Sequence, residues 1–235
     1  MDPHIRSSFD KSLEAVQAQV LRMGGMVEEA LLLAAEALDR RDDKLAEQVR
    51  LGDRAIDELE EMIHTECARI IALQSPAASD LRTVLTVMRV VGSLERSGDY
   101  AKNLAKRSLV LNQMQLVAGS TGSIARMARS VVALLHDALD AFAQRDVVLA
   151  EDVRRRDAEV DQIYNALFRE FLTHMMEDPR NITACMHLHF IAKNIERVGD
   201  HATGIAEQVI YLVNGRLPET ERPKVDSVSV SGKAG

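Results

Sequence analysis

Apolar side chains recur at alternating spacings of three and four over the first forty residues. That spacing is typical of one face of a long helix that packs nearly parallel to its neighbours. The polar stretch DRRDD at 39–43 is where we expect this first helix to end. The apolar positions of the stripe are Leu13, Val16, Val20, Met23, Val27, Ala30, Ala34 and Ala37.

The same periodicity predicts two more helices in the first half of the chain. Between them lies QSPAASDLR, in which Pro76 ends one helix and Ser79 or Asp80 is expected to cap the next. The stripe of the second helix consists of Leu45, Val49, Ile56, Leu59, Ile63, Cys67 and Ile70, and that of the third of Leu94, Ala101, Leu104 and Leu111.

The second half repeats the first. After a linker predicted at 113–123, the apolar period restarts at Ile124, and breaks near Gln144 and at MEDPRN (176–181) again divide the half into three. The segments LAEQVRLGDRAID and LAEDVRRRDAEVD share seven of thirteen residues, and LERSGDYAKNLAK and IERVGDHATGIAE share six.

These segments fall at equivalent places, in the second and third helix of each half. The pattern therefore predicts an all-α fold of two tandem, duplicated three-helix bundles with six long helices. The first bundle is expected over residues 1–112 and the second over 124–215. We expect the tail, 216–235, to be disordered because it has no apolar period.

Composition limits the possible partners. The chain has 29 Lys plus Arg against 36 Asp plus Glu, a net charge of −7, and no basic run, so nucleic acid and anionic membranes are disfavoured. Its apolar runs are too short to cross a bilayer, and its beginning lacks the apolar stretch of a secretory signal. Cys67 and Cys185 are expected to be buried thiols. We therefore predict a cytoplasmic protein without membrane insertion.

Paired carboxylates are the strongest chemical signal. Acids at positions i and i+4 face the same way, and like charges there cost a helix a few tenths of a kcal/mol per pair. A bound cation removes that repulsion, and carboxylate oxygens are donors for hard metals. The pairs are Asp53 with Asp57, Glu95 with Asp99, Asp157 with Asp161, and Glu196 with Asp200.

A glycine precedes the last acid of two pairs, where Gly98 and Gly199 interrupt otherwise helical patterns. Each costs about 1 kcal/mol relative to alanine inside a helix. One explanation is that a neighbouring backbone or a metal-bound ligand comes close beside the acid. The other is close helix packing alone.

The apolar stripes place all eight acids at positions b, e and f, off the core seam. We therefore expect them on the bundle surface, as a metal site or as a solvated acidic face. This placement disfavours ferritin-like oxidases, which bury their carboxylates. His64 lies two turns after Asp57 and is a possible additional ligand.

The segments SDLRTVLTVMRVVGSLERSGDYAKNLAKR (79–107) and FIAKNIERVGDHATGIAEQVIYLVNG (190–215) resemble the two signature helices of the PhoU family of phosphate-uptake regulators. The resemblance extends from about residue 8 to 215 and includes the duplication. It implies two three-helix bundles related by pseudo-two-fold symmetry, often assembled as homodimers. It also implies that the eight acids match the family's metal-cluster acids, with iron or zinc as the metal.

The resemblance further implies a non-enzymatic regulator that acts between a phosphate ABC transporter, chiefly its ATPase subunit, and a sensor histidine kinase. One position departs from the family pattern: the motif's Asn is present as Asn103 in the first half, but Gly204 replaces it in the second. Glu207 lies on the same face as Asp200 and is a possible substitute ligand.

The sequence therefore predicts a metal-binding adaptor for phosphate uptake and phosphate signalling. Two alternatives remain open. One is a carboxylate-metal helical-bundle enzyme or metal store, and the other is a helical scaffold that binds no metal.

Overall fold

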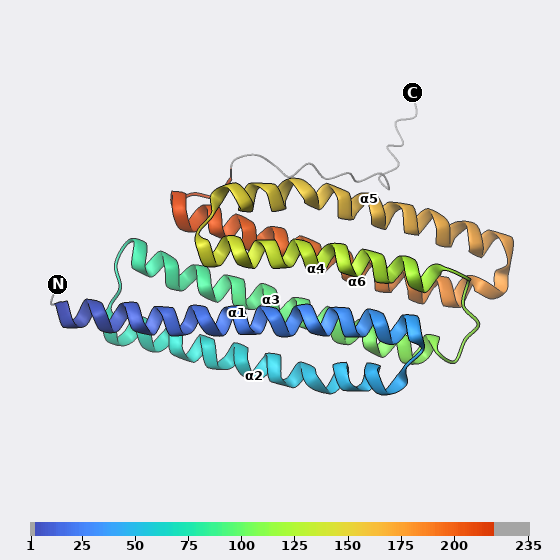
Figure 1. Cartoon of the computed structure of the whole chain (residues 1–235), viewed down its shortest axis with the longest axis horizontal. Coiled ribbons are helices and arrows are strands. Elements are labelled where there is room, and N and C mark those ends of the chain that lie inside the picture. The colour runs from blue at the N-terminus through green and yellow to red at the C-terminus, as the bar shows by residue number, and fades with distance from the viewer. Residues whose placement is uncertain (1–2, 219–235) are drawn as a thin grey trace, which may run out of the picture.

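A computed structural model describes residues 3–218 and shows six long helices, with no strand in that range (Figure 1). The predicted disordered tail falls largely on 219–235, which lie outside the described residues. The predicted all-α fold is confirmed. The helices are α1 (Pro3–Arg40), α2 (Asp43–Gln74), α3 (Ser79–Leu111), α4 (Ser120–Gln144), α5 (Val147–Glu177) and α6 (Ile182–Asn214), with a 3₁₀ turn, η1 (Pro179–Asn181), before α6.

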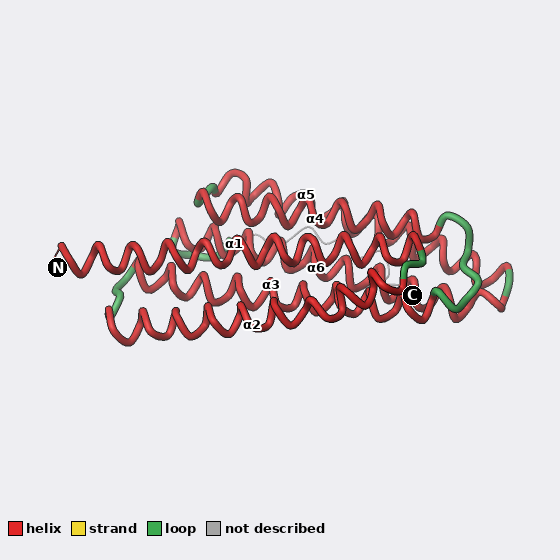
Figure 2. The backbone as a smooth tube through the Cα atoms, turned by 60° about the horizontal axis from the view of Figure 1, so that its bottom comes forward, coloured by secondary structure: helices red, strands yellow, loops and turns green. Residues whose placement is uncertain are grey.

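Two three-helix bundles, α1–α3 and α4–α6, lie side by side with their helices along the long axis of the molecule (Figures 1 and 2). Between the bundles, α1 packs against α4 and α3 packs against α6. The first and third helices of each half therefore meet their own counterparts, whereas α2 and α5 lie at the two outer edges, which is consistent with a two-fold relation between the halves. The helices α2, α3, α6 and α5 lie next to one another in that order and form one continuous layer. The helices α1 and α4 pack together on one face of this layer.

The core runs without interruption through both bundles. The predicted stripe of α1 is buried, except that Ala30 is only partly covered. The largest fully buried side chains include Phe142 of α4, Phe171 of α5 and Met23 of α1. Each such side chain contributes about 1.5–3 kcal/mol through removal of its apolar surface from water. No helix among the described residues is both long and apolar enough to cross a membrane.

The turns before α2 and α5 repeat one local structure. Arg41 and Arg145 adopt left-handed backbone angles, with φ of 55° and 54°. The next residue, Asp42 or Asp146, caps the following helix by accepting hydrogen bonds from the second and third amide groups, at 2.8–3.1 Å. Asx caps of this kind satisfy amides that have no partner inside the helix.

The cap predicted for the third helix is wrong. The residue before α3 is Ala78, which makes no side-chain cap, and Ser79 is already the first helical residue. Asp80 lies in the first turn, where its negative charge favours the positive end of the helix dipole. The linker is also shorter than predicted, because α4 begins at Ser120.

Both cysteines are buried free thiols, as predicted. Burial raises the pKa of Cys67 to about 11 and also raises the pKa of Cys185. The thiolate is the reactive form, so at pH 8 only about one Cys67 in a thousand is ionised. We expect neither thiol to react rapidly with Ellman's reagent in the native protein at pH 8, and both to react in denaturant. A fast-reacting native thiol would contradict this burial.

Candidate functional site

The eight predicted acids gather in two clusters at equivalent seams of the helix layer. We call the set Asp53, Asp57, Glu95, Asp99 and Lys102, at the α2/α3 seam, the first cluster. We call the set Asp157, Asp161, Glu196, Asp200 and Lys193, at the α5/α6 seam, the second cluster.

The acids are not all at the surface, and the prediction that they lie outside the core is wrong for three of them. Asp53 is 5% exposed, Asp157 is 7% exposed and Glu196 is 9% exposed. A single apolar stripe marks only one buried face of a helix, and these helices bury residues outside that face. Glu196 is covered because α6 packs against α3, α4 and α5 at once, whereas Asp53 and Asp157 are buried against α3 and α6 beside Gly98 and Gly199.

In the first cluster, the ammonium of Lys102 lies between two carboxylates. It donates to Oδ2 of the buried Asp53 and, at 3.1 Å, to Oδ1 of Asp99. Burial and the nearby charge of Asp53 raise the pKa of Asp57, although Lys102 opposes this. Burial and the charge of Asp99 likewise raise the pKa of Glu95. The first cluster is therefore crowded with negative charge that one lysine neutralises only in part.

In the second cluster, the lysine neutralises a different acid. Nζ of Lys193 donates to Oε1 of Glu196 at 2.7 Å and lies 5.1 Å from the centroid of the Tyr164 ring. The other oxygen, Oε2 of Glu196, is buried and has no hydrogen-bond partner among the described residues. Burial raises the pKa of Glu196, while Lys193 lowers it and Asp200 and Asp161 raise it further.

The two lysines do not correspond under the repeat. Lys102 aligns with Thr203, and Lys193 aligns with Gly92. The halves thus share the acids and differ in the cation that balances them. Sequence reasoning missed both lysines, although the signal was present: each lies one helical turn from an acid, three residues after Asp99 or three before Glu196.

Glu207, the predicted substitute ligand near Gly204, takes part in an ion pair. Its carboxylate lies 3.7 Å from Nε of Arg154, which is buried and also binds Glu151 at 2.7 Å. A possible ligand role of Glu207 would therefore compete with this ion pair.

The two glycines are explained by close packing between helices. A Cβ added at Gly98 would lie 3.1 Å from Cδ1 of Ile56 and 3.8 Å from Oδ1 of Asp53. A Cβ at Gly199 would lie 3.3 Å from Cγ1 of Val160 and 3.5 Å from an oxygen of Asp157. The glycines therefore let α2 and α5 approach α3 and α6, and they place the buried aspartates directly beside them.

Rings and guanidinium groups join α3 to α6 between the clusters. The rings of Tyr100 and His201 lie 5.9 Å apart, so His201 faces this seam rather than a cluster. At one end Arg89 lies over Tyr211, and at the other Arg107 lies 4.6 Å from the Phe190 centroid.

The other histidines are not shared ligands. His187 contacts Arg107 at 3.3 Å, whereas His189 packs against Tyr164 and Phe168, so the two face different neighbours, as predicted. Nε2 of His64 is buried and has no hydrogen-bond partner within the described chain.

The donor chemistry of both clusters suits a hard or borderline metal, and the buried Oε2 of Glu196 has an unused lone pair. With the lysines in their present places, however, no three His, Cys, Asp or Glu side chains among those that the structure describes converge as a metal site. Lys102 already binds two of the four acids of its cluster. A metal in the first cluster would therefore have to displace the Lys102 ammonium.

Comparison with known proteins gives one consistent result. The family model described as the PhoU domain matches residues 20–108 and 124–209. A phosphate-specific transport system accessory protein PhoU homolog from Caulobacter vibrioides is 44% identical over 229 residues, 97% of this chain and 100% of the relative. One of the same name from Rhizobium meliloti is 42% identical and covers 97% of each chain.

Solved structures agree with the sequence matches. The crystal structure of PhoU from Pseudomonas aeruginosa has a TM-score of 0.85 at 41% identity, covering 88% of this chain and all of that one. The phosphate transport system regulatory protein PhoU from Streptococcus pneumoniae has a TM-score of 0.83 at 32% identity, covering 90% of this chain and all of that one. Two family matches in one chain correspond to its two bundles, and with the duplicated acidic motif they establish that the chain belongs to the PhoU family.

Proposed function

We propose that this chain is a non-enzymatic accessory protein that regulates a phosphate-specific transport system. The names of its relatives support this, because they describe accessory and regulatory proteins of phosphate transport and no enzyme. The observation that carries the proposal is the duplication of an acidic cluster at the α2/α3 and α5/α6 seams of one helix layer.

We propose that the clusters bind metal, with iron or zinc as the best candidates for carboxylate ligands. The ligands would be Asp53, Asp57, Glu95 and Asp99 in the first cluster, and Asp157, Asp161, Glu196 and Asp200 in the second. A bound metal supplies positive charge to which an anionic or carboxylate group of a partner can bind. Lys102 and Lys193 partly neutralise the acids when no metal is bound, and the Lys102 ammonium would have to leave Asp53 and Asp99 when one binds.

The partners proposed for this surface are the ATPase subunit of a phosphate ABC transporter and a phosphate-responsive sensor histidine kinase. Both suit a cytoplasmic protein, and a homodimer would present the layer twice. The proposal requires no contact with nucleic acid, which the net charge of −7 disfavours.

Metal content is the first test. We expect the double variant Asp99→Asn with Asp200→Asn to remain folded and to lose most of the metal that the wild-type protein retains. The reason is that each substitution removes an anionic donor from one cluster. The measurement is elemental analysis of protein purified without chelator and without an affinity-tag metal.

A matched control removes two charges elsewhere, with Glu159→Gln and Glu177→Gln on exposed positions of α5. It should retain the wild-type metal content. Equal metal content in both double variants would contradict the ligand assignment. A wild-type protein that takes up no iron or zinc would contradict the metal site itself.

The accessory role is tested separately, by co-purification of the tagged protein with the transporter's ATPase subunit. We expect recovery of that subunit with the wild-type protein and with the α5 control, and a large loss with the Asp99→Asn, Asp200→Asn variant. Failure of the wild-type protein to retain the subunit would contradict the proposed partner, whatever its metal content.

A further inference from the structure

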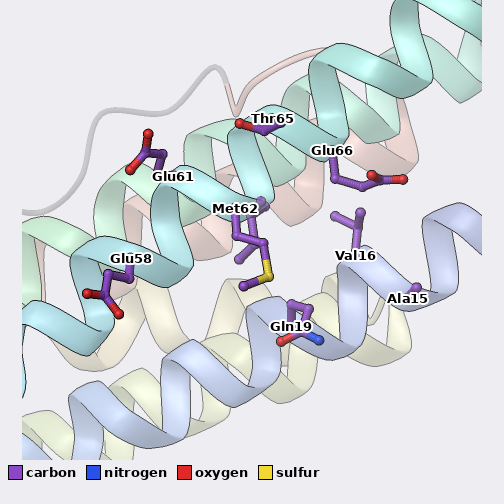
Figure 3. Close-up of a pocket in the computed structure, with 9 residues that line it drawn as sticks. Ala15, Val16, Gln19, Glu58, Glu61, Met62, Thr65 and Glu66 are labelled. Carbon is purple, nitrogen blue, oxygen red and sulfur yellow. The ribbon is translucent and has the colours of Figure 1, made fainter.

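Two hollows lie end to end along the seam between α1 and α2, on the other flank of α2 from the first cluster. The larger has a volume of about 570 Å³ and is drawn in Figure 3. The smaller, of about 260 Å³, continues along the same two helices toward Leu33 of α1 and Gln48 of α2. Together they form what we call the α1/α2 groove.

The groove exists because several residues between α1 and α2 have side chains too small to fill the space between the two helices. Ala15 lies opposite the α2 residues that line the larger hollow. In the smaller hollow, Ala30 of α1 faces a stretch of α2 that contains Gly52 and Ala55. The walls are mainly apolar, and Met62, which extends toward α1 in Figure 3, is 56% exposed. An exposed apolar side chain over an apolar floor gains free energy when a partner covers it.

The rim of the groove is acidic. Glu58 and Glu66 stand one turn before and one turn after Met62, and Glu61 lies beside it (Figure 3). Glu29 adds a fourth acid at the smaller hollow. Among the described residues, no Lys, Arg or His lines either hollow.

The acids at the rim can still bind the cationic side chains of another protein, because their present ion pairs are exposed to solvent. Glu58 pairs with Arg54 at 2.8 Å and Glu66 pairs with Arg69 at 2.9 Å, each within α2. Exposed pairs of this kind contribute little to stability, so they exchange readily for other partners. Glu61 makes no ion pair with any described residue.

The floor also has an unmet hydrogen-bonding need. Oε1 of Gln19 is buried at the lining of the larger hollow and accepts no hydrogen bond from the groups that the structure describes. A buried acceptor without a partner is unfavourable because it has lost its hydrogen bonds to water. A ligand that brings an N–H donor into the hollow would recover that free energy.

The dimensions suit a helix. The lining residues of α1 extend from Ala15 to Leu33, which at 1.5 Å per residue is about 27 Å, the length of a helix of about 18 residues. Helices that bind in grooves insert apolar side chains at spacings of three and four and contact the rim with their polar flanks.

We propose that the α1/α2 groove binds an amphipathic helix of a partner protein, with apolar anchors against Met62 and basic side chains against Glu58, Glu61 and Glu66. The site uses none of the eight acids of the clusters. The proposal is therefore independent of metal binding, and each can fail without the other.

The test uses a fluorescently labelled 18-residue peptide with leucines along one helical face and lysines on its flanks. Fluorescence anisotropy with the full-length protein should show saturable binding that weakens with added salt. The double variant Glu58→Gln with Glu61→Gln should bind at least tenfold more weakly, and so should Met62→Gln. The matched control Glu159→Gln with Glu177→Gln, which removes the same charge from α5, should bind like the wild-type protein.

Three results would overturn the proposal. One is equal affinity of the rim variant and the α5 control, which would make the binding a response to net charge. Another is equally tight binding of a peptide in which glutamates replace the lysines. The third is a change in the association state of the rim variant during sedimentation without peptide, which would assign the groove to a second copy of the chain.

Discussion

Replacing Lys102 by methionine is expected to lower the free energy of unfolding of the metal-free protein by about 2 kcal/mol. Removal of one partner from a buried ion pair costs about 3–5 kcal/mol, and we reduce this because the Lys102 side chain is 25% exposed. The carboxylate of Asp53 would remain buried beside Asp57 and Asp99 without its ammonium. For a chain of this length, about 2 kcal/mol lowers the melting temperature by roughly 4–8 °C. Chemical denaturation in a chelating buffer measures the change.

Two variants make the comparison specific. Lys106→Met removes an exposed lysine one turn further along α3 and should change stability little. The double variant Lys102→Met with Asp53→Asn removes both charges and should recover most of the loss. If zinc or iron binds the first cluster, it should stabilise Lys102→Met more than the wild-type protein, because no ammonium has to leave. A Lys102→Met protein as stable as Lys106→Met would show that Asp53 does not depend on this lysine.

Leucine in place of Gly98 is expected to destabilise the protein by about 1–3 kcal/mol, the usual cost of overpacking a well-packed seam. The first atom of the new side chain would already lie 3.1 Å from Ile56, and the rest has to force α2 away from α3. Since Asp53 lies beside the same glycine, the substitution should also displace this acid from Lys102. Thermal or urea unfolding gives the stability, and metal content reports on the cluster.

Gly92 provides the control on the same helix. A Cβ at Gly92 meets no atom of the described chain within 4 Å, other than its own helix. Gly92→Leu should therefore be neutral or stabilising by up to about 1 kcal/mol, because leucine favours helix more than glycine does. Equal effects of the two substitutions would show that Gly98 is not required for the approach of α2 to α3.

The sequence predicted the fold well because its signal is strong and repeated. Long apolar stripes indicate where helices form and which face of each is buried. The duplicated segments at 45–57 and 149–161 show which helices of the two halves correspond. The N-cap of α3 was not predictable in the same way. Ala78 precedes the first helical residue without capping it, although residues with better capping side chains, Ser79 and Asp80, follow directly.

The acidic clusters were predicted as sets of residues, but not their environment. One stripe per helix marks one buried face, whereas α6 is covered by three other helices, so Glu196 becomes buried at a position that the stripe left outside. The balancing lysines also depend on which side chains meet across a seam. The α1/α2 groove depends in the same way on the register between Ala15 and Met62, which lie far apart in the sequence.

The continuous layer of α2, α3, α6 and α5 holds the two clusters at a fixed separation. Neighbouring helix axes are about 8–10 Å apart, so two seams separated by the α3/α6 pair lie roughly 20 Å from each other across the layer. The aromatic and guanidinium contacts between α3 and α6 keep that spacing rigid. If a partner binds both clusters as proposed, its second contact forms without a further loss of translational freedom, and the duplication would make two sites act as one bivalent surface.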